Sequence, residues 1–189
     1  MATLFVDKID PQSGTSLEIG SSGDTISKGT GVVSRLGVFE SQLLHVRDEK
    51  DANTNGGTSS VGVNTRTLNT VKTNEITGAS LSSNQITLPA GTYYIEASAP
   101  LYRVYRCHAY LYNVTDSSNT IVGQARFVTN NSTNSDDLVN VNGRFTISAQ
   151  KVFELRQYTS QSGGSTSGLG ITNSQTTSVY ADVKIWRTA

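Results

Sequence analysis

Cys107 and His108 are an adjacent pair that could together bind a metal ion or form a thiolate–imidazole pair. The residues around them alternate between two sets of side chains with a period of two, which indicates a β-strand. Adjacent side chains of a strand point to opposite faces, so this pair cannot easily bind one ion. We therefore predict that Cys107 is a small buried apolar residue and that the pair holds no metal.

Two groups of carboxylates could supply oxygen ligands for calcium: Asp48, Glu49 and Asp51, and the adjacent Asp136 and Asp137. Neither group has the spacing of a known calcium-binding loop. The pattern favours a solvated loop at each place, and whether a loop binds calcium stays open. A polysaccharide hydrolase would need two carboxylates set apart across a groove, and adjacent loop acids are poor support for one.

Nucleophilic catalysis needs a nucleophile, a base within hydrogen-bond reach and a group that orients the base. The chain is rich in serine, but it has no Gly-x-Ser-x-Gly turn, and His45 and His108 lie in no recognisable motif. With Cys107 as its single cysteine, the chain has no internal disulfide. We therefore expect a non-enzymatic protein without a cofactor.

One face of the strand around Cys107 is aromatic and basic. Tyrosine and arginine are enriched in subunit contacts, so this face is a candidate subunit interface; an ordinary half-exposed sheet face is the alternative. Its tyrosines could also stack on sugars. Nucleic acid is disfavoured because 15 basic and 15 acidic residues leave no net charge. Alternation over residues 102–114 places on this face Tyr102, Arg106, His108, Tyr110 and Tyr112.

The elements that must position these residues are β-strands. Hydrophobic residues make up 35% of the chain, below the roughly 45–50% of globular domains with glycine counted, but the absence of net charge argues against disorder. No apolar run approaches the roughly 20 residues of a membrane helix, so no membrane contact is expected. About eight short strands and no convincing helix predict an antiparallel jelly-roll β-sandwich. The expected strands cover residues 39–46, 61–74, 86–88, 92–99, 102–114, 121–128, 145–147, 152–158 and 178–187.

Residues 1–36 differ from the rest because turn-forming residues recur every few positions. The apolar stretches between these turns are too short to form a core, so we predict an extended N-terminal arm that needs a partner surface. A loose tail is the alternative. Residues 37–189 then form the jelly-roll domain, in which the Gly/Ser-rich loop 160–170 is expected to be flexible. The candidate anchoring residues of the arm are Leu4, Phe5, Val6, Ile9, Leu17 and Ile19.

Two parts of the chain resemble known families. Residues 84–97 form a strand, a Leu-Pro-Ala-Gly turn and an aromatic strand, similar to a segment of tumour-necrosis-factor-like jelly rolls, including the complement globular-head type. Residues 106–113 and 180–187 fit the same plan. The opening segments 6–15 and 17–26 resemble the tail-fibre or virion-attachment segments of tailed phages.

The resemblance to these jelly rolls implies a homotrimer around a threefold axis, with the aromatic and basic face as the candidate trimer interface and residues 37–189 as the trimerisation domain. The resemblance to phage segments implies that the arm docks onto a phage capsid or tail protein. The predicted function is a non-enzymatic bacteriophage virion structural protein, a head decoration (cement) protein or short fibre, assembled in the host bacterial cytoplasm. The alternative is a carbohydrate-binding receptor-recognition adhesin of the phage tail, whose partner is a host surface glycan.

Overall fold

The computed structural model describes residues 42–129 and 136–188, which are all-β. In this part of the chain, no helix is long and apolar enough to cross a membrane. The predicted arm, residues 1–36, lies outside the described residues, as do its candidate anchoring residues. The described strands are β1 Gln42–Lys50, β2 Gly62–Thr65, β3 Thr70–Asn74, β4 Ser80–Ser82, β5 Gln85–Leu88, β6 Gly91–Tyr102, β7 Tyr105–Asn113, β8 Ser118–Val122, β9 Arg126–Val128, β10 Asp136–Ile147, β11 Lys151–Thr159 and β12 Ser178–Arg187.

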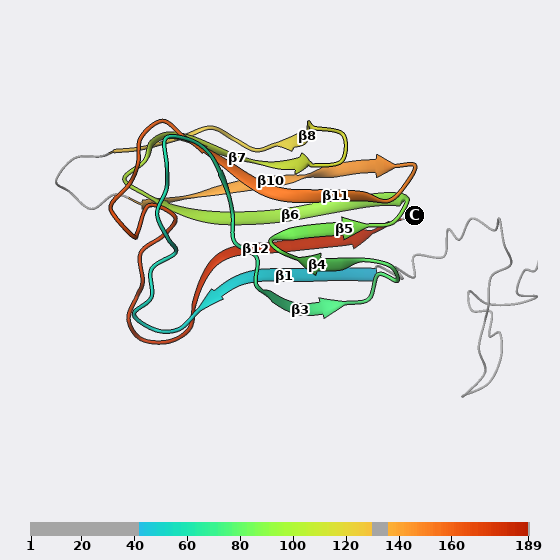
Figure 1. Ribbon diagram of the computed structural model, residues 1–189, viewed down its shortest axis with the longest axis horizontal. Coiled ribbons are helices and arrows are strands. Elements are labelled where there is room, and N and C mark those ends of the chain that lie inside the picture. The colour runs from blue at the N-terminus through green and yellow to red at the C-terminus, as the bar shows by residue number, and fades with distance from the viewer. Residues whose placement is uncertain (1–41, 130–135, 189) are drawn as a thin grey trace, which may run out of the picture. The chain divides into compact units, whose positions relative to one another are not determined.

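The strands form two antiparallel sheets whose strands run along the long axis of the sandwich (Figure 1). One sheet has five strands in the order β10-β6-β12-β1-β3. The other has seven, with β4-β5-β11-β7-β8 in order, β2 beside β11 and β9 beside β7. The chain crosses from one sheet to the other at every step from β1 to β4, and again between β5 and β6, β6 and β7, β9 and β10, β10 and β11, and β11 and β12. This arrangement is the predicted jelly-roll sandwich.

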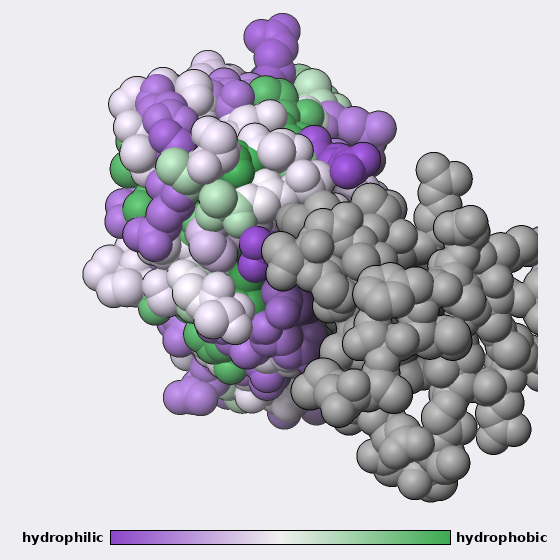
Figure 2. All heavy atoms as spheres, turned by 90° about the vertical axis from the view of Figure 1, so that its right-hand side faces the viewer, coloured by the Kyte–Doolittle hydropathy of each residue, from purple (hydrophilic) through white to green (hydrophobic). Residues whose placement is uncertain are grey.

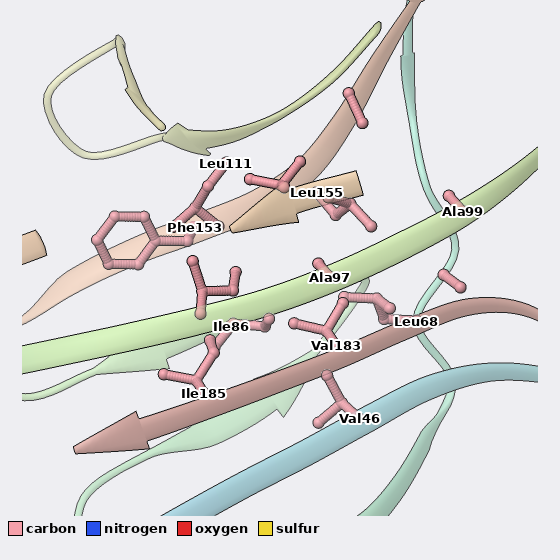
Figure 3. Packing of buried hydrophobic residues seen from close by; sticks show 14 of the residues in the cluster. Val46, Leu68, Ile86, Ala97, Ala99, Leu111, Phe153, Leu155, Val183 and Ile185 are labelled. Atoms are coloured by element: carbon pink, nitrogen blue, oxygen red, sulfur yellow. The ribbon is translucent and has the colours of Figure 1, made fainter. Parts of the chain in front are cut away.

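Apolar side chains from both sheets fill the layer between them (Figure 3). Val183 and Ile185 of the five-stranded sheet and Leu111, Phe153 and Leu155 of the seven-stranded sheet all belong to this layer, and all five are almost fully buried. Burying such a side chain stabilises a fold by roughly 1.5–3 kcal/mol. Because the apolar residues occupy alternate positions of the strands, a modest apolar content is enough to fill the core.

Three of the expected strands are interrupted. Residues 61–74 divide into β2 and β3, which lie in opposite sheets, and residues 121–128 divide into β8 and β9. Residues 102–114 divide between the end of β6 and β7, because the chain turns at Arg103 and Tyr105, whose φ angles are 58° and 62°. A left-handed backbone at these two residues breaks the alternation that the sequence pattern suggested.

Arg66, between β2 and β3, is buried completely at one end of the sandwich. Its guanidinium donates hydrogen bonds to the backbone carbonyls of Leu169, at 2.9 Å, and Tyr180, and to Oε1 of Gln157 at 3.2 Å. A longer contact of 3.4 Å reaches the carbonyl of Pro100. Burial lowers the pKa of Arg66 to about 10, so the side chain remains charged at neutral pH. One cation therefore joins segments that are far apart in the sequence.

Two loops, 51–61 and 160–177, close the end of the sandwich away from the C-terminus (Figure 1). Gly56 N–H donates to the carbonyl of Gly170 at 2.9 Å, and further backbone hydrogen bonds link the two loops. A Cβ atom at Gly56 would lie 2.4 Å from the carbonyl oxygen of Leu169, so only glycine fits this close approach. The Gly/Ser-rich stretch that we predicted to be flexible is thus held by contacts that its composition does not reveal.

Replacing Arg66 by methionine should lower the free energy of unfolding by about 3 kcal/mol or more, because the carbonyls of Leu169 and Tyr180 lose a buried donor. Urea denaturation of both proteins measures the difference. The control is Arg187→Met, since Arg187 donates to the carbonyl of Ala90 at an exposed site and its loss should cost below about 1 kcal/mol. Equal effects of the two substitutions would contradict this role of Arg66.

Candidate functional site

The outer face of the seven-stranded sheet carries a group of aromatic and charged side chains from two neighbouring strands, β7 and β11. Cross-strand register pairs them as Tyr112 with Glu154, Tyr110 with Arg156, and His108 with Tyr158. Side chains paired in this way across an antiparallel sheet lie close enough to interact. We call these residues the aromatic cluster: His108, Tyr110, Tyr112, Glu154, Arg156 and Tyr158.

Arg156 is the basic residue of the aromatic cluster and contacts two of its other members. Its guanidinium carbon lies 3.6 Å from the ring centroid of Tyr112, a cation–π contact. Its Nε donates to Oε2 of Glu154 at 2.7 Å. The cation is thus engaged both by an aromatic face and by a carboxylate of its own chain.

Glu154 is surrounded by donors. Gln85 Nε2 donates to Oε1 at 2.9 Å, and Thr65 Oγ1 donates to Oε2 at 3.1 Å. Burial, the largest single effect, raises the pKa of Glu154, but the hydrogen bonds from Gln85, Arg156 and Thr65 and the charge of Arg156 outweigh it, so this pKa lies below its usual value. Glu154 is therefore an ionised acceptor within the sheet face, not a proton donor.

The remaining rings of the aromatic cluster pack on one another. The His108 ring stacks on Tyr158 with centroids 5.6 Å apart and lies at the same distance from Tyr110. Tyr110 is only 6% exposed, whereas Tyr158 is 36% exposed. Of the predicted trimer-interface residues, His108, Tyr110 and Tyr112 are brought together, and their contacts are largely with each other and with β11.

Tyr102 does not join the aromatic cluster. It is the last residue of β6, in the five-stranded sheet, and is 7% exposed. The prediction that Tyr102 shares a face with His108 is wrong, because the chain passes to the other sheet between these residues. Arg106 does lie on β7, where it is exposed and pairs in register with Phe127 of β9.

Phe127 is an exposed aromatic residue that sequence reasoning missed. It is 56% exposed, and its ring meets the edge of Tyr105, 37% exposed, at a centroid distance of 5.1 Å. We call Tyr105, Arg106 and Phe127 the Phe127 patch. At the end of the sandwich shown in Figure 2, by contrast, the coloured surface is mostly polar, with small separate apolar areas.

The outer face of the five-stranded sheet carries a group of paired charges. Asp182 Oδ1 lies 2.5 Å from His45 Nε2 and accepts a hydrogen bond from Arg47 Nε at 2.8 Å. Lys184 Nζ lies 3.2 Å from Asp182 Oδ2. Burial, the largest single effect, raises the pKa of Asp182, but the hydrogen bonds from His45, Arg47 and Lys184 outweigh it and lower this pKa to about 2.

Four of the acidic residues that we considered for calcium lie on strands and not in the expected solvated loops: Asp48 and Glu49 on β1, and Asp136 and Asp137 at the start of β10. Asp48 is 1% exposed and accepts two hydrogen bonds from Lys50 Nζ, at 2.8 and 2.7 Å, while Glu49 pairs with Lys72 at 3.3 Å. Asp137 pairs with Arg126 at 3.7 Å. Within residues 42–129 and 136–188, no three or more His, Cys, Asp or Glu side chains are grouped so that they could hold a metal ion.

Cys107 is a buried free thiol, as the alternation of its strand predicted. Burial is the main cause that raises its pKa, to about 11, and the charge of Asp137 adds to the effect. A thiol with such a pKa carries almost no thiolate at neutral pH and is therefore a poor nucleophile.

Comparisons with known proteins identify the fold. No family model matches the sequence, and no curated protein matches it. The crystal structure of murine APRIL at pH 8.5 matches with a TM-score of 0.53 and 9% sequence identity, over 78% of this chain and 99% of that chain. Murine APRIL at pH 5.0 matches with a TM-score of 0.51 and 8% identity over the same shares. These are jelly rolls of the tumour-necrosis-factor family, so this chain has a tumour-necrosis-factor-like jelly-roll fold.

The depressed pKa of Asp182 makes part of the stability dependent on pH. Because the folded pKa, about 2, lies below the ordinary value of 3.8, this contribution is complete above about pH 4 and is lost as the pH falls through about 2. Between about pH 4.5 and 2, the wild type should lose about 1–2 kcal/mol more unfolding free energy than Asp182→Asn. Urea denaturation across this range provides the measurement.

The matched control for this experiment is Asp116→Asn. Asp116 is 45% exposed and pairs with Lys151 at 2.6 Å at the surface. An exposed ion pair contributes little to stability, so this variant should keep the pH dependence of the wild type. If Asp182→Asn keeps it too, the ion pairs of Asp182 do not stabilise the fold.

Proposed function

We propose that this protein is a non-enzymatic structural subunit of a bacteriophage virion, which forms a homotrimer through residues 37–189 and is anchored by the arm 1–36. The observation that carries the proposal is the jelly-roll sandwich, which is similar in fold to tumour-necrosis-factor-family structures. The sequence resemblance to such jelly rolls implies packing around a threefold axis. The opening segments 6–15 and 17–26, which resemble phage virion-attachment segments, support the virion assignment.

The Phe127 patch supports self-association. An exposed phenylalanine ring in contact with a second exposed ring is apolar area that gains roughly 25 cal/mol per Å² when another surface covers it. A threefold ring requires contacts between two different patches, since only twofold contacts are self-complementary. The patch would therefore pack on a different surface of the neighbouring subunit, and the charge of Arg106 would be placed at the rim.

The chemistry of the described residues supports a non-enzymatic role. Cys107 has a buried thiol of raised pKa, and Glu154 and Asp182 are ionised acceptors engaged by basic side chains of their own sheets. Catalytic acids and bases need pKa values near the working pH, which these three groups do not have.

The place of the protein in the particle follows from the same proposal. The arm would bind a capsid or tail protein, and the jelly roll would face outward as a head decoration (cement) protein or short fibre. Assembly would take place in the host bacterial cytoplasm. Neither nucleic acid nor a membrane is among the proposed partners.

The proposed trimer predicts the effect of a single surface substitution. Light scattering should give three times the chain mass for the wild type at micromolar concentration. Phe127→Ser should weaken the trimer by tenfold or more if the ring is central to the contact, since buried aromatic side chains dominate interface energies at about 2 kcal/mol or more each.

The control for Phe127→Ser is Val71→Ser, which removes a 49% exposed apolar residue on β3, the edge strand of the other sheet. This variant should keep the wild-type mass. A wild-type protein that is monomeric at micromolar concentration would overturn the trimer. A trimer that survives Phe127→Ser would place its contact elsewhere.

The proposed arm predicts a separation of two properties. A variant that lacks residues 1–36 should still trimerise but should be missing from purified virions, because the jelly roll and the anchor are distinct parts. Immunoblotting of virions produced with either form measures incorporation. Equal incorporation of both forms would show that the arm is not the anchor.

A further inference from the structure

The outer face of the five-stranded sheet contains a hollow of about 410 Å³ over β10, β6 and β12. Small and medium-sized polar side chains line it in two cross-strand rows. Asn142, Glu96 and Lys184 form one row, and Asn140, Ser98 and Asp182 form the next. We call these six residues the polar hollow.

The polar hollow is divided into engaged and free groups. Lys184 and Asp182 pair with each other, and Asp182 also binds His45 and Arg47. Within the described residues, the side chains of Glu96, Asn140 and Asn142 have no hydrogen bond or ion pair. One free carboxylate and two free amides therefore face the same small space.

Two aromatic rings stand beside the polar hollow. Tyr94 and Trp186 are paired in register, with ring centroids 6.2 Å apart. Tyr94 precedes Glu96 by two positions, and Trp186 follows Lys184 by two positions. Both rings therefore lie on the same outer face as these residues, about 7 Å from them along the strands. Tyr94 is 38% exposed. The hollow thus has an aromatic pair next to a set of unpaired hydrogen-bonding groups.

The chemistry of these groups selects one class of ligand. The polar lining gives an apolar ligand no partner. The free carboxylate of Glu96 repels an anion, while Lys184 is engaged by Asp182. A sugar ring has hydroxyl groups that carboxylates and amides bind in both directions and an apolar C–H face that packs on tyrosine and tryptophan. We infer that the polar hollow, together with Tyr94 and Trp186, binds a neutral saccharide.

The saccharide site lies on a different sheet from the aromatic cluster and the Phe127 patch. It does not depend on the proposed trimer or on the virion assignment. It places a glycan ligand away from Tyr102, Tyr110 and Tyr112, the residues that the sequence suggested for sugar stacking.

Trp186 makes the inference directly measurable, because it is the only tryptophan in the chain. Intrinsic fluorescence of the full-length protein therefore reports on this face alone. Titration with glucose, galactose, mannose, rhamnose and N-acetylglucosamine should give a saturable change in emission for at least one neutral sugar, in the millimolar range. Glucuronate and N-acetylneuraminate, which carry a carboxylate, should bind at least tenfold more weakly.

Matched variants separate the site from the rest of the protein. Glu96→Gln/Asn142→Ala removes the free acceptor charge and one amide, and should weaken the best sugar at least tenfold. The control is Asn119→Ala, because Asn119 is likewise an exposed strand asparagine without a side-chain partner among the described residues, but lies on the seven-stranded sheet. Its affinity should stay within twofold of the wild type.

Three results of the titrations would overturn the inference: no sugar changes the emission of Trp186, the carboxylate-bearing sugars bind more tightly than neutral ones, or the double variant binds like the control. Acrylamide quenching tests a further occupant, a second copy of the chain. If Trp186 is shielded from acrylamide in the wild type but accessible in the Phe127→Ser monomer, a neighbouring subunit covers the hollow. That result would also overturn the saccharide inference. A monomeric wild type that still binds sugar would instead contradict only the proposed trimer.

Discussion

The packing at one end of the sandwich depends on the hydrogen bonds of the buried Arg66 guanidinium. A charged group at such a place is costly to desolvate, and hydrogen bonds to its terminal nitrogens offset much of that cost, although Nε of Arg66 has no partner among the described residues. Here the acceptors are two backbone carbonyls, a glutamine amide and a more distant third carbonyl. Because these acceptors belong to β6, β11, β12 and the loop before β12, the cation can be accommodated only when all four segments are in place.

The same constraint explains why polar loops can form a packed structure at this end. Loops 51–61 and 160–177 contain few apolar side chains, so hydrophobic burial alone cannot hold them. The loops are held instead by backbone hydrogen bonds between them and by the hydrogen bond that Arg66 donates to the carbonyl of Leu169. The core between the sheets and the polar network at the end thus stabilise different parts of one fold.

The two outer faces of the sandwich use their polar groups differently. On the seven-stranded sheet, the charges of Arg156 and Glu154 are paired, and the ring of Tyr112 packs on the Arg156 guanidinium. On the five-stranded sheet, the groups around Asp182 are paired, while Glu96 and Asn142 in the same hollow are free. Free polar groups in a hollow are suited to a polar ligand, and exposed rings such as Phe127 are suited to a protein surface. The two kinds of surface can therefore serve separate partners.

The sequence by itself determined the β-sandwich, the inward position of Cys107 and the common face of His108, Tyr110 and Tyr112. Each of these follows from the two-residue repeat of a strand, which is a local property. Tertiary structure decided that Tyr102 belongs to the other sheet, because a left-handed backbone at Arg103 interrupts a pattern that the residue types continue.

Tertiary structure also decided which strands become neighbours. Nothing near Tyr112 in the sequence indicates that Arg156 packs on its ring, and nothing near Glu96 indicates that Asn142 faces it. The burial of Arg66 could not be inferred either, since it lies within residues 61–74, whose pattern predicted a single strand. Strand alternation is set by each segment alone, whereas sheet order and register depend on contacts between distant segments, which only the complete fold brings together.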